Sequence, residues 1–156
     1  AYVNRGARLA ANMPIQAEQS ALLVVDIQSR LLPAMAAPEP VVANASKLMI
    51  AATRLGVPIL VSEQYPKGLG PSVPEIAALT PAGAVLEKTA IGFRALGYEI
   101  AVAWDATGSR READKALAAD RLRADGVTLA GVEMVLFEWL GRAGTPDFKE
   151  ISALIK

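Results

Sequence analysis

Residues 21–28 read Ala21-Leu22-Leu23-Val24-Val25-Asp26-Ile27-Gln28, an apolar run that contains a single carboxylate near its end. A short apolar run predicts a strand that is buried on both faces of a sheet, here over 21–27. In an open parallel sheet, ligands bind in the crevice beyond the carboxyl ends of the strands. Asp26 stands at that end of the strand and is therefore a candidate site residue.

Two further strand-like runs also end in a charged residue. The first is Val57-Pro58-Ile59-Leu60-Val61-Ser62, which is followed by Glu63, and the second is Ala84-Val85-Leu86-Glu87, which is followed by Lys88. If the three strands share one parallel sheet, two acids and an amine lie around one crevice. Such a group can transfer protons and stabilise a developing anion.

The rest of the chain alternates strand and helix patterns. Strands are expected at 98–104 and 127–130, and helices at 41–55, 74–79, about 109–124, about 133–140 and about 146–155. Ser109 and Glu112 have the spacing of a capping box for the third of these helices. The alternation predicts an α/β protein with a parallel sheet.

Composition excludes several kinds of chemistry. The 156 residues fit one domain, 53% of them are hydrophobic, and the net charge of zero does not favour nucleic acid or an anionic membrane surface as a partner. The chain contains no Cys and no His, so a thiolate nucleophile, a His base and a Cys or His zinc site are excluded, and we expect neither metal nor cofactor. Without a visible signal peptide we expect a cytoplasmic protein. Residues 1–19 are expected to be an N-terminal extension of a domain over 20–156, and the part before Met13 is expected to be mobile.

One interval between predicted strands is too short. Parallel neighbours need a crossover of about a dozen residues or more, and residues 89–97 provide only nine. Ile91–Gly97 has the pattern of the end of an amphipathic helix whose beginning is missing. Either the local topology is unusual, or a strand and most of a helix are absent between Lys88 and Ile91, and crossover length favours the second explanation.

Several motifs together resemble one known family. They are Val24-Val25-Asp26-Ile27-Gln28, Glu87-Lys88-Thr89, the run from Ser62 to Glu75, Asp105 to Arg110, and Gly141 to Lys149. This set is similar to the isochorismatase-like hydrolases, often called cysteine hydrolases, and in particular to their isochorismatase-domain-containing branch. The resemblance extends over nearly everything from about Ser20 to Lys156.

The resemblance implies a fold and a mechanism. The family fold is a three-layer α/β/α sandwich with a mainly parallel, Rossmann-like six-stranded sheet, and its members commonly assemble into homo-oligomers. The usual triad is Asp, Lys and Cys; Asp26 and Lys88 match the first two, and the Cys normally follows the fourth strand. That strand belongs to the unit missing here, which should amount to roughly 30 residues or more. Asp26 would take the thiol proton, Lys88 would hold the pair ionised, and the thiolate would attack an amide-like carbonyl.

The remaining candidates keep two interpretations each. Gln28, Glu63, Gln64 and Tyr65 could bind substrate, or they could order the Pro-rich loop that follows Glu63. For the whole chain, the first hypothesis is a metal-free hydrolase of a small amide-like substrate. The second is a non-catalytic fold relative that binds or forms oligomers. A few relatives lack the cysteine and cleave an enol ether by acid catalysis, so the missing nucleophile does not by itself exclude activity.

Overall fold

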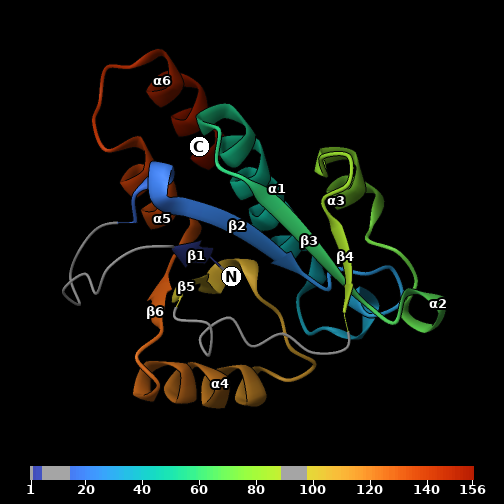
Figure 1. Ribbon diagram of the computed structural model, residues 1–156. Coiled ribbons are helices and arrows are strands. Elements are labelled where there is room, and N and C mark those ends of the chain that lie inside the picture. Colours follow the sequence, from blue (N-terminus) through green and yellow to red (C-terminus); the bar gives the residue numbers. More distant parts are fainter. Residues whose placement is uncertain (1, 5–14, 89–97) are drawn as a thin grey trace.

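A computed structural model describes residues 2–4, 15–88 and 98–156, and in this part of the chain it contains one six-stranded sheet with the order β4-β3-β2-β1-β5-β6 (Figure 1). Strands β2, β3 and β4 are parallel to one another, and β5 is parallel to β6. The predicted α/β class and parallel sheet are confirmed. The bounds are Tyr2–Asn4 for β1, Ser20–Val25 for β2, Ile59–Gln64 for β3, Val85–Lys88 for β4, Glu99–Ala103 for β5 and Thr128–Ala130 for β6.

Strand β1 occupies the centre of this sheet. It is antiparallel to both neighbours, and Tyr2 is in register with Leu22 of β2 and with Ala101 of β5. From the sequence, residues 1–19 were expected to be an N-terminal extension that precedes the domain. In the structure Tyr2–Asn4 joins the two parallel halves of the sheet, and Ile15 is buried in the core.

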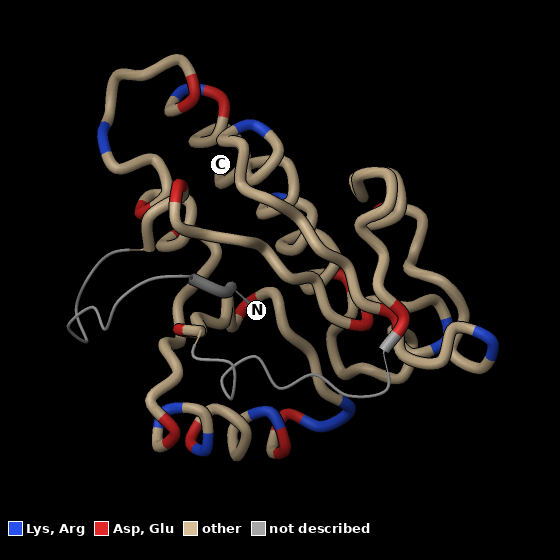
Figure 2. The backbone as a smooth tube through the Cα atoms, in the orientation of Figure 1, with Lys and Arg blue, Asp and Glu red and all other residues tan. Residues whose placement is uncertain are grey.

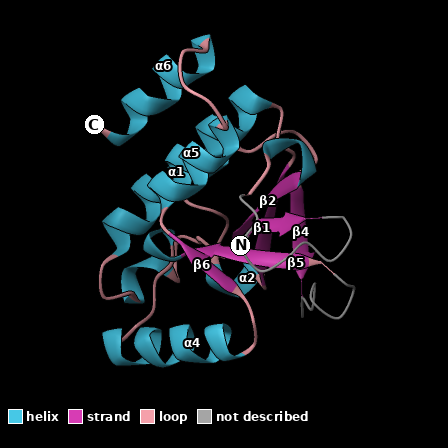
Figure 3. Cartoon of the chain, turned by 90° about the vertical axis from the view of Figure 1, so that its left-hand side faces the viewer, coloured by secondary structure: helices cyan, strands magenta, loops and turns pink. Residues whose placement is uncertain are grey.

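The helices form a layer against the sheet. Helices α1, α5 and α6 lie together on one side of it, whereas α4 lies apart from them and packs against β6 (Figure 3). Helix α3 packs against α1. The bounds are Pro38–Leu55 for α1, Pro66–Leu69 for α2, Pro74–Leu79 for α3, Glu112–Ala124 for α4, Val132–Leu140 for α5 and Pro146–Ser152 for α6.

The core lies between β2, β3 and this helical layer. Alternate residues of β2 point into it, and Leu22 and Val24 are buried there beside Met49 of α1. Burying an apolar side chain of this size contributes about 1.5–3 kcal/mol, so the layer holds β2 firmly in place. No helix in the described ranges is long and apolar enough to cross a membrane.

Three local expectations need correction. Helix α1 begins at Pro38 rather than at 41, because proline is tolerated in the first turn, where its missing N–H has no partner to lose. The predicted capping box at Ser109 is wrong, because α4 begins at Glu112 with Arg111 as its N-cap. Strand β2 ends at Val25 because the next residue, Asp26, has a positive φ of 55° that a strand does not accommodate.

Of two further sequence predictions, the helix end at Gly56 is confirmed and the missing unit between Lys88 and Ile91 is not tested. Gly56 ends α1 in the left-handed conformation, with φ of 70°, as the sequence predicts. The proposed absence of a strand and helix between Lys88 and Ile91 falls on residues 89–97, which lie outside the described residues. It therefore stays a prediction.

Candidate functional site

Asp26 is held at the carboxyl end of β2 by two contacts with β3. Its backbone N–H donates to the carbonyl of Ser62 at 3.0 Å, and the Ser62 hydroxyl lies 3.3 Å from the Asp26 carboxylate as a donor. Ser62 is fully buried and Asp26 is half-buried. A buried donor beside a carboxylate limits the orientations of that carboxylate, so Asp26 is a fixed rather than a freely rotating acid.

Lys88 is the last residue of β4, at the same edge of the sheet. It is in register with Gln64 of β3, and β3 separates β4 from β2. Neighbouring strands lie about 4.8 Å apart, so the backbones that carry Asp26 and Lys88 are separated by roughly 10 Å across the sheet. The two residues of the predicted acid and amine pair are thus brought to one edge from positions 62 residues apart in the chain.

Gln28 is a fully buried amide that ties β2 to the loop after β3. Its side-chain nitrogen donates to the carbonyl of Gly70 at 2.6 Å and to that of Gln64 at 3.1 Å. Its side-chain oxygen accepts from the backbone N–H of Gln64 at 2.8 Å. Three hydrogen bonds from one buried side chain fix the start and the middle of this loop.

Glu63 acts on the same loop from the other side. One oxygen of its buried carboxylate accepts from the Ser72 backbone N–H at 2.7 Å and from the Ser72 hydroxyl at 2.8 Å. A buried carboxylate needs such donors, because its desolvation is otherwise costly. Glu63 therefore closes the loop at Ser72.

Tyr65 differs from these neighbours. It has a left-handed backbone with φ of 45° and a side chain that is 65% exposed. Its ring lies over Gly68, where a Cβ atom would collide with it. The structure thus gives Gln28, Glu63 and Gln64 a role in ordering the loop, and leaves the Tyr65 ring accessible. Substrate contacts by these four residues remain a prediction.

Acidic residues gather at the carboxyl ends of the three parallel strands. Asp26, Glu63 and Glu87 follow or end β2, β3 and β4, and Figure 2 shows this cluster of acidic positions. Within the described ranges no group of three or more acidic residues has the arrangement of a metal site. Among these three acids, Asp26 and Glu63 accept hydrogen bonds from Ser62 and Ser72 respectively.

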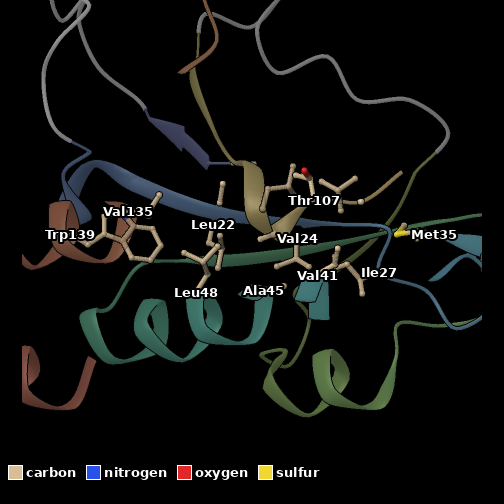
Figure 4. A pocket seen from close by; sticks show the side chains of 15 residues that line it. Leu22, Val24, Ile27, Met35, Val41, Ala45, Leu48, Thr107, Val135 and Trp139 are labelled. Atoms are coloured by element: carbon tan, nitrogen blue, oxygen red, sulfur yellow. The ribbon is translucent and has the colours of Figure 1, made fainter. Parts of the chain in front are cut away.

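An apolar cavity of about 250 Å³ lies on the other side of β2. It is bordered by β2 from Leu22 to Val25, by Ala103 of β5, and by side chains of α1 and α5, and it extends from Trp139 at one end to Met35 and Ile27 at the other (Figure 4). We did not predict this cavity from the sequence.

Curated relatives align with most of the chain. It is 31% identical to isochorismatase domain-containing protein 2A of Mus musculus, over 89% of this chain and 84% of the relative. It is 34% identical to isochorismatase domain-containing protein 2 of Danio rerio, over 87% of this chain and 86% of the relative. No protein-family model matches the chain.

Solved structures share the fold at lower identity. A MAR1 ribonuclease from Caenorhabditis elegans superposes with a TM-score of 0.82 at 24% identity, over 94% of this chain and 92% of that chain. The YcaC gene product of Escherichia coli, described as an octameric hydrolase of unknown specificity, superposes with a TM-score of 0.80 at 18% identity, over 92% and 91% of the two chains. At these identities the likeness establishes the fold alone.

Proposed function

Because the chain belongs to the isochorismatase domain-containing protein family, we propose that it is a hydrolase of a small amide-like substrate, with Asp26 and Lys88 as its acid and amine. One observation supports the assignment most directly. The carboxylate of Asp26 is fixed by the buried Ser62 at the edge of the sheet where β4 delivers Lys88.

The proposed roles follow from charge and position. Ionised Asp26 accepts a proton from the nucleophile, and the ammonium of Lys88 stabilises negative charge that develops on the substrate. Asp26 directly follows β2 and Lys88 ends β4, and both strands are parallel to β3. The carboxyl ends of parallel strands share one edge of a sheet, which supports a shared site.

We propose that the nucleophile belongs to a segment that is absent from this sequence, and the gapped lengths of two alignments support this proposal. The alignment with the mouse relative spans 172 positions, whereas 89% of 156 residues is about 139, so about 33 positions have no residue of this chain. For the zebrafish relative, 170 positions against 87% of 156 leave about 34. Both values match the size of one strand and one helix. We place this unit between Lys88 and Ile91, where the interval is too short for a parallel crossover.

Two measurements on the protein isolated from its source test the nucleophile. Intact mass separates a chain of 16.4 kDa from a longer one, and a thiol-reactive probe reports a cysteine. We expect a heavier, labelled protein that hydrolyses members of a panel of small primary amides. A protein of 16.4 kDa that takes no label would remove the thiolate mechanism.

Substitutions test the pair itself. We expect Asp26→Asn and Lys88→Ala to abolish hydrolysis while leaving the circular dichroism spectrum unchanged. Asp120→Asn and Lys149→Ala, which change exposed helical residues of the same types, are the matched controls and should retain full turnover. Retained activity in either site variant would remove that residue from the mechanism.

A non-catalytic relative is the second candidate, and the centre of the sheet favours it. Within the described residues, Tyr2–Asn4 pairs with both β2 and β5, so the two parallel groups of strands belong to one sheet. For this candidate we expect no hydrolysis of any amide in the panel by a chain of 16.4 kDa that is folded and cooperative in urea.

We also propose that the chain forms homo-oligomers. A structural relative, YcaC of Escherichia coli, is described as octameric. Several large apolar side chains of α1 and α5 are partly exposed here, among them Ile50, Met134 and Phe137. Light scattering coupled to size exclusion measures the assembly directly, and a monomer at micromolar concentration would contradict this proposal.

A further inference from the structure

Tyr65 shares an unusual backbone conformation with Asp26. Within the described residues these are the two non-glycine positions with a positive φ, 45° for Tyr65 and 55° for Asp26, and they follow the ends of neighbouring strands. A left-handed backbone is rare for a bulky residue, and the residue before a proline, here Pro66, favours an extended one. Strained residues of this kind persist where the surrounding structure enforces them, and they cluster at active sites and ligand-binding loops.

The Tyr65 ring rests on Gly68, which belongs to the short helix α2. A Cβ atom at position 68 would overlap Cδ1 and Cε1 of the ring. Gly68 is not among the glycines with a positive φ, so its backbone does not require glycine, and alanine would favour the helix. The glycine therefore makes room for the ring. The Tyr65 carbonyl also accepts from the N–H of Gly68 at 2.9 Å and of Leu69 at 3.0 Å, which fixes the backbone below the ring.

Arg30 is held against the same glycine. Its Nη1 donates to the Gly68 carbonyl at 3.2 Å, and its backbone N–H donates to the Leu69 carbonyl at 3.0 Å. A guanidinium has five N–H donors, so four remain for another acceptor, and no acidic side chain in the continuous described range 15–88 forms an ion pair with it. Because both groups contact Gly68, the Tyr65 ring edge and the guanidinium lie within about 9 Å of each other.

The backbone of Tyr65 is close to the proposed acid and amine. Tyr65 directly follows Gln64, which is in register with Lys88, so the backbones of Tyr65 and Lys88 are about 6 Å apart. Asp26 follows β2, whose register with β3 ends at Ser62, which places its backbone about 8 Å from that of Tyr65. A small ligand can therefore reach the ring and the strand ends together.

We propose that the Tyr65 ring and the Arg30 guanidinium bind a planar ring that carries a carboxylate, and that the substrate is an amide of this class. Aromatic rings stack on one another beyond what buried area alone provides, and a guanidinium fork matches the two oxygens of a carboxylate. The identity of the substrate rests on the proposed hydrolytic function, whereas the binding site does not.

A purely structural role for Tyr65 is the competing explanation, and two observations disfavour it. The side chain is 65% exposed, so it buries little apolar surface and adds little to stability. The loop is already fixed at other points, by the buried side chains of Gln28 and Glu63. A ring held in a strained position without a gain in burial is explained by contact with a ligand.

The test measures the binding of three probes to the 156-residue chain by NMR titration. The probes are 4-carbamoylbenzoate, benzamide, which lacks the charge, and trans-4-carbamoylcyclohexanecarboxylate, which lacks the planar ring. We expect 4-carbamoylbenzoate to bind about three- to tenfold more tightly than either of the others. It should also shift the aromatic signals of Tyr65 and the guanidinium signals of Arg30.

Variants around the ring separate its presence from its position. Tyr65→Leu removes the ring and should weaken the binding of both aromatic probes by about three- to tenfold, without affecting the cyclohexane probe. Tyr65→Phe keeps the ring and should restore this binding. Gly68→Ala leaves Tyr65 in place but displaces its ring, so it should weaken the same two probes.

A matched pair of arginine variants tests the charge. Arg30→Gln should weaken the binding of 4-carbamoylbenzoate by about three- to fivefold and leave benzamide unchanged. Arg142→Gln changes an exposed arginine after α5 and should affect neither probe. Circular dichroism and urea denaturation establish that each variant is folded.

Three results would overturn the proposal: a folded wild-type chain that binds none of the probes, equal affinity for all three, or wild-type affinity for 4-carbamoylbenzoate in Tyr65→Leu. Turnover separates this proposal from the hydrolytic function. A chain that binds 4-carbamoylbenzoate without hydrolysing it would contradict the proposed function and support the binding site. A chain that hydrolyses amides with the same kcat/KM in the wild type and in Tyr65→Leu would support the function and contradict the binding site.

Discussion

The two sides of β2 have opposite character. On the β3 side, register continues from Leu22 to Val25, and beyond the strand Gln28 bonds the loop after β3. On the β1 side, register stops at Leu22 and an apolar cavity follows. The β3 side of β2 is paired along the strand and continues into a network of buried hydrogen bonds, whereas pairing on the β1 side covers only Ser20 to Leu22.

The two sides differ in how firmly the surrounding structure holds the backbone of β2 and of the residues that follow it. The ordered side presents Asp26 at a fixed position, because Ser62, Gln28 and the loop hold the backbone around it. The incomplete side leaves space in the core, which costs packing energy that a filled core would gain. The expected catalytic site is therefore on the β3 side of β2, where hydrogen bonds from Ser62 and Gln28 hold the surrounding structure.

The largest effect on the free energy of unfolding is expected from removing the buried side-chain amide of Gln28, on the β3 side of β2. Gln28→Leu leaves the N–H of Gln64 and the carbonyl of Gly70 without their partner, and each unsatisfied buried group costs about 1–3 kcal/mol. We expect a loss of about 3 kcal/mol in the free energy of unfolding, measured in urea. Gln19→Leu, at an exposed glutamine, should cost less than about 0.5 kcal/mol. Equal losses in the two variants would mean that the network does not stabilise the ordered side.

Deleting residues 1–4 tests the incomplete side. Strand β1 is the link between β2 and β5 in the described sheet, so its loss removes pairing on both flanks. At about 0.5–1.5 kcal/mol for each hydrogen bond, we expect a destabilisation of about 2 kcal/mol. Hydrogen exchange should show faster exchange in β5 and unchanged exchange in β3. Unchanged stability and exchange would exclude β1 from the sheet in solution.

A pair of leucine substitutions on α1 compares the filled and the unfilled core. Ala51 is fully buried outside the cavity, so Ala51→Leu overpacks the core and should cost about 1–3 kcal/mol. Ala45 faces the cavity, so Ala45→Leu should stabilise the protein by about 0.5–2 kcal/mol. Opposite signs in urea denaturation are expected, and two losses of similar size would mean that the cavity is collapsed in solution.

The smallest effect is expected far from both sides, at the contact between α1 and α6. Arg54 lies 2.7 Å from Asp147 and 2.6 Å from Glu150, and its hydrogen bond with Asp147 is the main cause that raises its pKa above the ordinary value of an arginine. A raised pKa contributes its full stability at every pH below the unfolded-state pKa of the arginine, so the arginine itself adds no pH dependence near neutrality. Arg54→Ala should lower stability only slightly, and the difference should shrink in 1 M salt. A difference that is independent of salt would show that the ion pairs are not its source.

Much of the fold followed from local pattern. The apolar runs at β2, β3, β4, β5 and β6 were predicted with boundaries that moved by one or two residues, because five short strands with intervening helices leave few alternatives. The boundaries that failed, at Pro38 and Ser109, depend on turn geometry that a pattern of residue types does not specify.

The site was only partly accessible from the sequence. Strand ends identified Asp26 and Lys88, since the carboxyl ends of parallel strands share an edge. The bonds of Gln28 and Glu63 to the loop were one of two interpretations, because an amide or a carboxylate beyond a strand suits a ligand as well as a backbone group. Only the hydrogen-bond distances in the folded chain showed that Gln28 and Glu63 bond to backbone groups of the loop.

The sequence by itself determined that strands alternate with helices, that an acid and an amine end two of the strands, and that none of these 156 residues is a cysteine. Only the tertiary structure decided that Tyr2–Asn4 lies at the centre of the sheet and that a cavity follows it. The physical reason is that apolar pattern records whether a residue is buried, whereas strand neighbours and the space between them depend on contacts between distant parts of the chain.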